Sequence, residues 1–201
     1  LPSVATRTPW YCAGCPHNSS TKLPDGEVVG MGIGCHSISG FLTPDDITNF
    51  TQMGGEGAFW IGRSPFSKHN HSFQNIGDGT YAHSGYLGIR AAVAAGVNMT
   101  FKILYNGAVA MTGGQTVEGG QTPWIMSRQL AAEGIVKIAI VTDTLDDLPN
   151  SADWASNSQI YHRRDIIRVQ QELKLIPGVT AIIYIQNCAT ELRRKRKRGI
   201  I

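Results

Sequence analysis

The sequence has few charged residues, no long apolar run and no leader. Charged residues make up 16% of the 201 residues and hydrophobic residues 42%. This balance excludes a disordered chain and allows one α/β domain with a sizeable core. No run approaches the ~20 apolar residues that span a bilayer, so we expect no membrane partner. Because neither a signal peptide nor an initiator Met opens the chain, we expect Leu1 to be a cut point in a longer, cytoplasmic polypeptide.

The positive charges are concentrated near one end. The formal net charge is +3, but the basic run of residues 193–198 supplies +6, which leaves −3 for the rest of the chain. Such a run can contact nucleic acid or an acidic partner. No interleaved aromatic residues accompany it, so we expect no nucleic acid and interpret residues 191–201 as a solvated basic linker to a further C-terminal region.

The order of β-favouring and helix-favouring runs predicts a doubly wound α/β domain with a mainly parallel sheet flanked by helices. We place this domain at residues 27–190, after an irregular cysteine loop at residues 1–26. We expect strands at 28–33, 73–76, 99–105, 135–141 and 179–185. We expect helices at 43–53, 83–95, 122–134 and 158–175.

Two groups of residues follow strands that we expect to be neighbours. Gly77-Asp78-Gly79 comes directly after one strand, and Asn106 follows the next strand along the chain. Alone, Gly-Asp-Gly is usually an ordinary turn. In an open α/β sheet, however, ligands bind beyond the carboxyl ends of the strands. Carboxylate and amide oxygens suit a Mg²⁺ that is completed by phosphate oxygens, so we predict a metal–diphosphate site here.

These residues resemble the signature of thiamine-diphosphate enzymes. The segment 103–115 (ILYNGAVAMTGGQ), with its Thr-Gly-Gly-Gln ending, is similar to the 2-oxoacid:ferredoxin oxidoreductases. Residues 53–57 (MGGEG) and 188–191 (CATE) resemble the long, fused indolepyruvate ferredoxin oxidoreductases. The resemblance implies a thiamine-diphosphate-binding fold whose cofactor is bound by Gly77, Asp78, Gly79, Thr80, Asn106, Ala108, Thr112 and Gln115.

The resemblance also implies a metal set and an activity. Asp78, Asn106 and the Ala108 carbonyl would hold Mg²⁺, although Gly107 departs from the Asn or Asp usual at its position. The implied activity is oxidative decarboxylation of an aryl 2-oxoacid, indolepyruvate, to its acyl-CoA. Coenzyme A and ferredoxin would be partners, along with other domains of the same polypeptide in a homo-oligomer. The glutamate that activates the cofactor would lie in one of those domains, so we assign no catalytic residue here and expect this piece alone to be inactive.

Three alternatives stay open at this point. One is an oxidoreductase for pyruvate or 2-oxoglutarate. The second is a non-redox thiamine-diphosphate decarboxylase or lyase, in which the cysteines are incidental. The third is a non-catalytic binding module whose basic tail contacts a polyanion.

Four cysteines suggest a second cofactor. Cys12 and Cys15 form a Cys-x-x-Cys pair, while Cys35 and Cys188 follow strands at the same sheet edge as the diphosphate site. Such a set can hold zinc, hold a [4Fe–4S] cluster or form disulfides, and the last fits an intracellular enzyme least well. The family resemblance implies that all four bind a [4Fe–4S] cluster. His17 and His36 flank the cysteines and could contact either the cluster or a substrate carboxylate.

Overall fold

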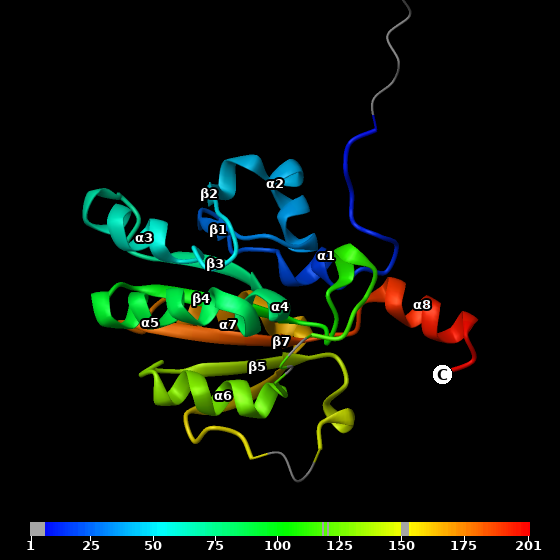
Figure 1. The fold of residues 1–201 in the computed structure, drawn as a ribbon. Helices are drawn as coiled ribbons and strands as arrows, with labels where there is room; N and C mark the ends of the chain where they lie inside the picture. Colours follow the sequence, from blue (N-terminus) through cyan, green and yellow to red (C-terminus); the bar gives the residue numbers. More distant parts are fainter. Residues whose placement is uncertain (1–6, 118, 120, 150–152) are drawn as a thin grey trace, which may run out of the picture.

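The computed structural model describes residues 7–117, 119, 121–149 and 153–201. Seven parallel strands form one sheet in the order β2-β1-β3-β4-β7-β5-β6 (Figure 1). In chain order the strands are β1 (Val29–Met31), β2 (Ile47–Phe50), β3 (Ser72–Gly77), β4 (Met99–Tyr105), β5 (Ile138–Thr142), β6 (Ser158–His162) and β7 (Val179–Ile185). The predicted doubly wound parallel sheet is therefore confirmed.

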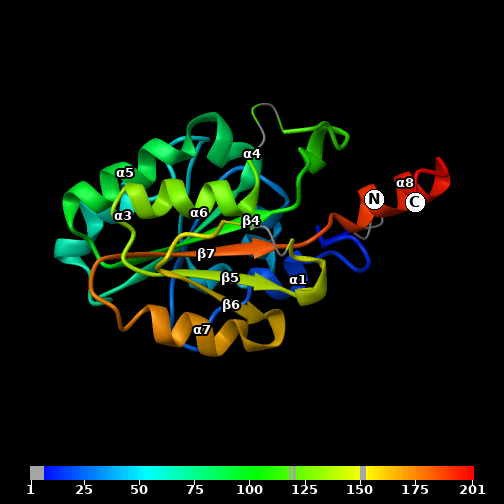
Figure 2. The ribbon, with the colours of Figure 1, turned by 90° about the horizontal axis from the view of Figure 1, so that it is seen from below.

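Helices cover both faces of the sheet. They are α1 (His17–Ser20), α2 (Ser39–Leu42), α3 (Ala58–Arg63), α4 (Asp78–Thr80), α5 (Tyr86–Ala95), α6 (Pro123–Ala132), α7 (Ile166–Leu173) and α8 (Ala189–Lys197). Figure 2 shows α3, α5 and α6 on one face and α7 with α1 on the other. Among the residues that the structure describes, no helix is long and apolar enough to cross a membrane.

The central strands are buried because helices cover both faces of the sheet. On one side, Phe101 and Ile103 of β4 pack in a cluster that includes Ile89 of α5 and Leu130 of α6, all with no exposed surface. On the other side, Leu104 belongs to a second cluster, to which α7 contributes. These two layers fix β3, β4 and β7 side by side, so the residues that follow them lie at one edge.

Two predicted helices are partly wrong. At residues 43–53 the structure has a short 3₁₀ turn, Pro44–Asp46, followed by the edge strand β2. At 158–175 the first five residues form the edge strand β6, and the helix α7 begins only at Ile166. Both strands are only partly buried. Ile47 pairs with Val29 in β1, and Ile160 pairs with Ile140 in β5. These pairings stabilise the extended backbone, which the local sequence does not specify.

One helical run begins earlier than predicted, and one helix was not predicted. The helical run expected from His83 starts at Asp78 and continues through a π-helical turn, Tyr81–Gly85, into α5. Gly96 ends it with a left-handed backbone, as predicted. In the segment expected to be a basic linker, residues 189–197 form helix α8. The boundaries of the predicted domain, 27–190, and the connection of residues 191–201 to a further region stay predictions.

Candidate functional site

Asp78 connects the ends of β3 and β4. Its side chain lies at the start of α4, and the residue is 3% exposed. One carboxylate oxygen, Oδ2, accepts hydrogen bonds from the backbone N–H groups of Asn106 at 3.0 Å and Gly107 at 2.7 Å. The other, Oδ1, accepts from the N–H of Gly79 at 2.9 Å. The structure thus confirms that the Gly-Asp-Gly turn and Asn106 follow adjacent strands at the same edge of the sheet.

The backbone at this edge is open to a ligand. A side-chain carbon placed on Gly77 would meet no atom within 4 Å. The helical run starts at the next residue, where Gly77 provides no side-chain cap, and the N–H of Gly79 is already bonded to Asp78 Oδ1. Free N–H groups at a helix start, together with the helix dipole, favour an anion such as a phosphate. The observed helix start at Asp78 is therefore closer to the end of β3 than the start predicted at His83.

A cavity of about 620 Å³ extends from this edge. The residues predicted to bind cofactor line it at Gly77, Asp78, Gly79, Thr80, Asn106, Ala108 and Thr112. The opposite part of the lining includes Cys35, His17 and His36, and the apolar part includes Met53, Val109 and Met111. The cavity therefore joins the predicted diphosphate cradle to the predicted cysteine site.

Gln115 behaves differently from the other predicted residues. It is not among the residues that line the cavity. Instead its Nε2 donates to the Thr112 carbonyl at 2.9 Å, and its Oε1 accepts from the Thr112 hydroxyl at 2.8 Å. The backbone N–H of Val109 donates to the Gln115 carbonyl at 2.8 Å and closes the loop. The exposed side chain of Gln115 thus shapes the loop that follows Asn106, and its contact with a cofactor stays a prediction.

The oxygens near Asp78 fit a hard cation. Burial raises the pKa of the Asp78 carboxyl, and three N–H groups only partly oppose this. A buried carboxylate of this kind is stabilised by a nearby positive charge. Asn106 Oδ1 accepts one hydrogen bond, from the N–H of Ala108 at 3.0 Å, which leaves its second lone pair free for a metal. Asp78, Asn106 and the Ala108 carbonyl therefore offer an oxygen set of the type that Mg²⁺ prefers.

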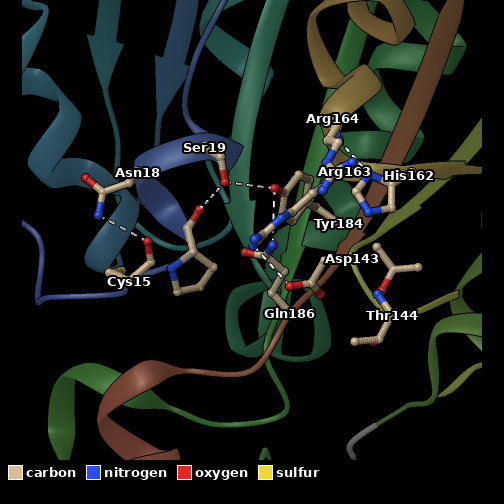
Figure 3. Close-up of polar contacts among 12 residues, drawn as sticks. Cys15, Asn18, Ser19, Asp143, Thr144, His162, Arg163, Arg164, Tyr184 and Gln186 are labelled. Atoms are coloured by element: carbon tan, nitrogen blue, oxygen red, sulfur yellow. Dashed lines mark hydrogen bonds and ion pairs between the residues drawn. The ribbon is translucent and has the colours of Figure 1, made fainter.

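The cysteine loop is attached to both sides of the cavity. The hydroxyl of Tyr11, next to Cys12, donates to the His36 carbonyl at 3.3 Å. On the other side, Ser19 Oγ and Tyr184 Oη of β7 lie 3.0 Å apart within hydrogen-bond distance (Figure 3). Gln186, just beyond β7, donates to the same tyrosine oxygen at 3.2 Å. These contacts hold the loop between the ends of β1 and β7.

The four cysteines are electrostatic neighbours. Burial raises the pKa of the Cys15 thiol, and the nearby thiols of Cys35, Cys12 and Cys188 add to this. Burial likewise raises the pKa of Cys35, with contributions from Cys188 and Cys12. All four are free thiols. Within the described ranges, no three or more His, Cys, Asp or Glu side chains are grouped tightly enough to hold one metal ion. Four free thiols that influence one another's pKa values are a donor set of the type that an iron–sulfur cluster or a zinc ion takes.

Two histidines are placed in the cavity wall by the fold. His36 is 1% exposed, and its Nε2 has no hydrogen-bond partner among the described residues. Its ring lies edge-on to that of His17, with 6.2 Å between centroids. Burial lowers the pKa of His36 to about 3 and that of His17 to about 4, so both are neutral at pH 7. The sequence predicted that both could contact the cluster or a substrate carboxylate, and both line the cavity. His36 is placed there by the 3₁₀ turn Cys35–Ile38 and His17 by helix α1, neither of which was predicted.

The sequence of the chain is similar to a known protein family and to a curated protein. A family model described as the C-terminal TPP-binding domain of thiamine pyrophosphate enzymes matches residues 32–155, which include Asp78 and Asn106. Indolepyruvate oxidoreductase subunit IorA of Thermococcus kodakarensis is 25% identical over 218 aligned residues, covering 98% of this chain and 32% of that protein. The chain therefore spans about a third of the length of this curated relative.

A solved structure shares the fold. The 2-oxoglutarate:ferredoxin oxidoreductase of Magnetococcus marinus, determined with 2-oxoglutarate, coenzyme A and succinyl-CoA bound, superposes with a TM-score of 0.63. The match covers 93% of this chain and 66% of that one, at 19% sequence identity. The parallel sheet with its flanking helices is thus an arrangement already known in solved structures.

Proposed function

Because the chain belongs to the family of thiamine pyrophosphate enzymes, with their C-terminal TPP-binding domain, we propose that it is the cofactor-binding part of a 2-oxoacid:ferredoxin oxidoreductase. The proposed substrate is an aryl 2-oxoacid, indolepyruvate. The similarity to an indolepyruvate oxidoreductase subunit along nearly the whole chain supports this choice. Other domains of the same polypeptide, a homo-oligomeric assembly and a cytoplasmic location are part of the proposal.

The proposed reaction balances in atoms and electrons. The bond between the 2-oxo carbon and the carboxylate breaks and releases CO₂, and a bond from the acyl carbon to the sulfur of coenzyme A forms. The thiol proton is released, and the electron pair leaves as single electrons to two oxidised ferredoxins. Thiamine diphosphate, when bound, supplies the stabilisation of negative charge that decarboxylation requires. A [4Fe–4S] cluster would carry the single electrons outward.

The residues of this chain bind and orient in this scheme. Asp78 and Asn106, with the Ala108 carbonyl, would hold the Mg²⁺ that neutralises the diphosphate. The first N–H groups of the helical run at Asp78 would bind the phosphate oxygens. The apolar residues Met53, Val109 and Met111 line the cavity and would contact the apolar parts of the cofactor or substrate. Cys12, Cys15, Cys35 and Cys188 would bind the cluster.

One observation carries the redox part of the proposal. Cys35 lines the same cavity as Asp78 and Asn106, and it is also an electrostatic neighbour of Cys12 and Cys188. A one-electron carrier bound by these thiols would therefore lie against the cofactor cavity. A non-redox decarboxylase or lyase has no use for this arrangement.

The test is an assay of the full-length protein after anaerobic purification. Indolepyruvate, pyruvate and 2-oxoglutarate are each supplied with coenzyme A and either ferredoxin or a viologen dye, and iron and zinc are measured in the same sample. We expect iron without zinc, and the highest kcat/KM with indolepyruvate. Cys35→Ser should lower the iron content. Ser37→Ala, a matched control in the same turn, should leave it unchanged.

Two results would overturn parts of the proposal. Decarboxylation without any acceptor reduction, in a protein free of iron, would favour the non-redox lyase. The highest kcat/KM with 2-oxoglutarate would correct the substrate. That second candidate is retained because the matching solved structure is an oxidoreductase for 2-oxoglutarate.

A further inference from the structure

Helix α8 is fixed to the site by two arginines near its middle. It begins directly after Cys188, and Figure 1 shows it leaving the edge of the sheet and pointing away from the domain. Arg193 donates to the carbonyl of Ala13, between Cys12 and Cys15. Arg194 donates to the Gly113 carbonyl at 2.8 Å, in the loop that follows Asn106. The helix is therefore held against both the cysteine loop and the cavity loop, which a solvated linker would not be.

The C-terminal end of α8 carries exposed cations that form no ion pair with the described residues of the domain. Lys195, Arg196, Lys197 and Arg198 are exposed. None of the four appears among the ion pairs formed by the described residues. A helix rises about 1.5 Å per residue, so these cations lie roughly 10 to 15 Å along the axis from Cys188. They form a basic surface beside the proposed cluster, and Cys12 on the adjoining loop is itself exposed.

We propose that the exposed cations of α8, residues 195–198, are the docking surface for an acidic one-electron carrier protein of the ferredoxin class. This inference rests on the proposed function, which needs such a carrier. Outside the basic run of residues 193–198 the chain carries a formal charge of −3, so an acidic partner is repelled elsewhere and drawn to α8. Docking there would bring the carrier beside the loop that carries Cys12 and Cys15, where a cluster would be nearest to solvent.

Other anionic ligands fit this surface less well. The phosphates of coenzyme A belong near the reacting carbon, but none of the described residues that line the cavity comes from α8. A nucleic acid gains affinity from bases stacked on aromatic side chains, and residues 189–198 contain none. Charge complementarity at a surface rim mainly accelerates association, which suits a carrier that must bind and leave in each turnover.

The test compares two acceptors in the full-length protein. In one variant Lys195, Arg196, Lys197 and Arg198 are all changed to Gln, which removes charge but keeps a good helix former. We expect the KM for a [4Fe–4S] ferredoxin of acidic isoelectric point to rise about tenfold at low ionic strength. Activity with a viologen dye should be unchanged. Direct binding of the oxidised ferredoxin, measured by surface plasmon resonance, should weaken in parallel and lose most of its salt dependence.

A matched pair of variants controls for charge alone. Arg196→Gln with Arg198→Gln removes two cations from α8. Arg63→Gln with Lys68→Gln removes two exposed cations before the start of β3, at the end of the sheet where the strands begin and away from α8. Only the first pair should weaken ferredoxin binding.

Three outcomes would overturn the docking proposal. They are unchanged ferredoxin binding in the fourfold variant, an equal loss with dye and ferredoxin, or a raised KM for coenzyme A with ferredoxin binding intact. Failure of the unaltered protein to reduce any acceptor would instead overturn the proposed function. The direct binding measurement still decides whether α8 binds the carrier in that case.

Discussion

The side chain of Asp78 is hydrogen-bonded to the backbone of Asn106, 28 residues later in the chain, through an oxygen 3.0 Å from the Asn106 nitrogen. This bond joins the ends of two adjacent parallel strands. Asp78 thus has two tasks, because it fixes the loop that carries Asn106 and also presents a carboxylate to the cavity. A substitution here should affect both the loop and the bound ligand.

We predict that Asp78→Asn weakens binding of thiamine diphosphate with Mg²⁺ by roughly 10 to 100-fold, because it removes both a charged ligand and an acceptor for the loop. Isothermal titration calorimetry measures the affinity. Asp153→Asn is the control, since the Asp153 side chain is 75% exposed and pairs with Arg128 at the surface. Equal affinity of the Asp78 variant and the unaltered protein would contradict the assignment of the metal site.

Ligand binding should stabilise the protein through the same carboxylate. Burial raises the pKa of Asp78, so the folded state favours its protonated form. Its contribution to the free energy of unfolding is therefore present at low pH and is lost as the pH rises through the folded pKa. At neutral pH, burial of the charged Asp78 carboxylate destabilises the protein unless a cation lies beside it. With ligand at about 100 times its Kd, the free energy of unfolding should rise by about 2.7 kcal/mol.

Differential scanning calorimetry with and without Mg²⁺ and thiamine diphosphate measures this stabilisation. The increase should become smaller as the pH is lowered, because protonation of Asp78 removes the charge that binds the cation. In Asp78→Asn at the same ligand concentration, binding that is roughly 10 to 100-fold weaker should leave about 0.4–1.4 kcal/mol. If ligand raised the free energy of unfolding of the variant by the same amount, the cation would have to bind at another site.

Gly88 and Gly62 form a matched test of helix packing. A side-chain carbon on Gly88 in α5 would lie 2.2 Å from the backbone carbonyl oxygen of Glu56, whereas one on Gly62 in α3 would meet no atom within 4 Å. Gly88→Ala should destabilise the protein by roughly 1–3 kcal/mol, since backbone cannot move aside easily. Gly62→Ala should stabilise it by about 0.5–1 kcal/mol through helix propensity. Urea unfolding gives both values, and similar effects of the two changes would disprove the close contact.

Lys102 should make stability depend on pH in the alkaline range. Burial lowers the pKa of Lys102 to about 7, while the unfolded chain keeps the ordinary value of 10.5. Between these values the unfolded state binds more protons, so the free energy of unfolding rises with pH from about 7 to about 10.5. Lys102→Met should remove this dependence and, by the cost of the shift, stabilise the protein at pH 7 by roughly 2–5 kcal/mol.

The hydrogen bonds around Lys102 permit this change. Its Nζ donates to the Lys22 carbonyl at 3.1 Å, but Gln170 Nε2 donates to the same oxygen, also at 3.1 Å. The carbonyl therefore keeps a partner in Lys102→Met. Urea unfolding at pH 7 and at higher pH compares the two proteins, with Lys68→Met as an exposed control. The variant could instead be less stable than the unaltered protein at both pH values. That result would show that the contacts of the Lys102 side chain stabilise the protein by more than burial of its charge destabilises it.

The sequence predicted some elements well and others poorly, for a physical reason. Strands β4 and β7 are buried and mostly apolar, so their sequences identify them without knowledge of their neighbours. The edge strands β2 and β6 are short and partly buried, and their residues fit a helix equally well until a neighbour pairs with them. Gln115 was expected at the cofactor because it ends a family motif, yet its side chain bonds to Thr112.

What the sequence alone determined is the cradle. A Gly-Asp-Gly turn and an Asn that end consecutive buried strands must meet at one sheet edge if those strands are adjacent, so local pattern was sufficient to place Asp78 near Asn106. The sequence also placed Cys35 and Cys188 at this edge, and only the tertiary structure showed the strand order that puts them on either side of β3 and β4. Only it showed that Arg193 and Arg194 hold α8 against that loop and the cavity. Such relations depend on the order of strands and on contacts between distant segments, which local residue patterns do not specify.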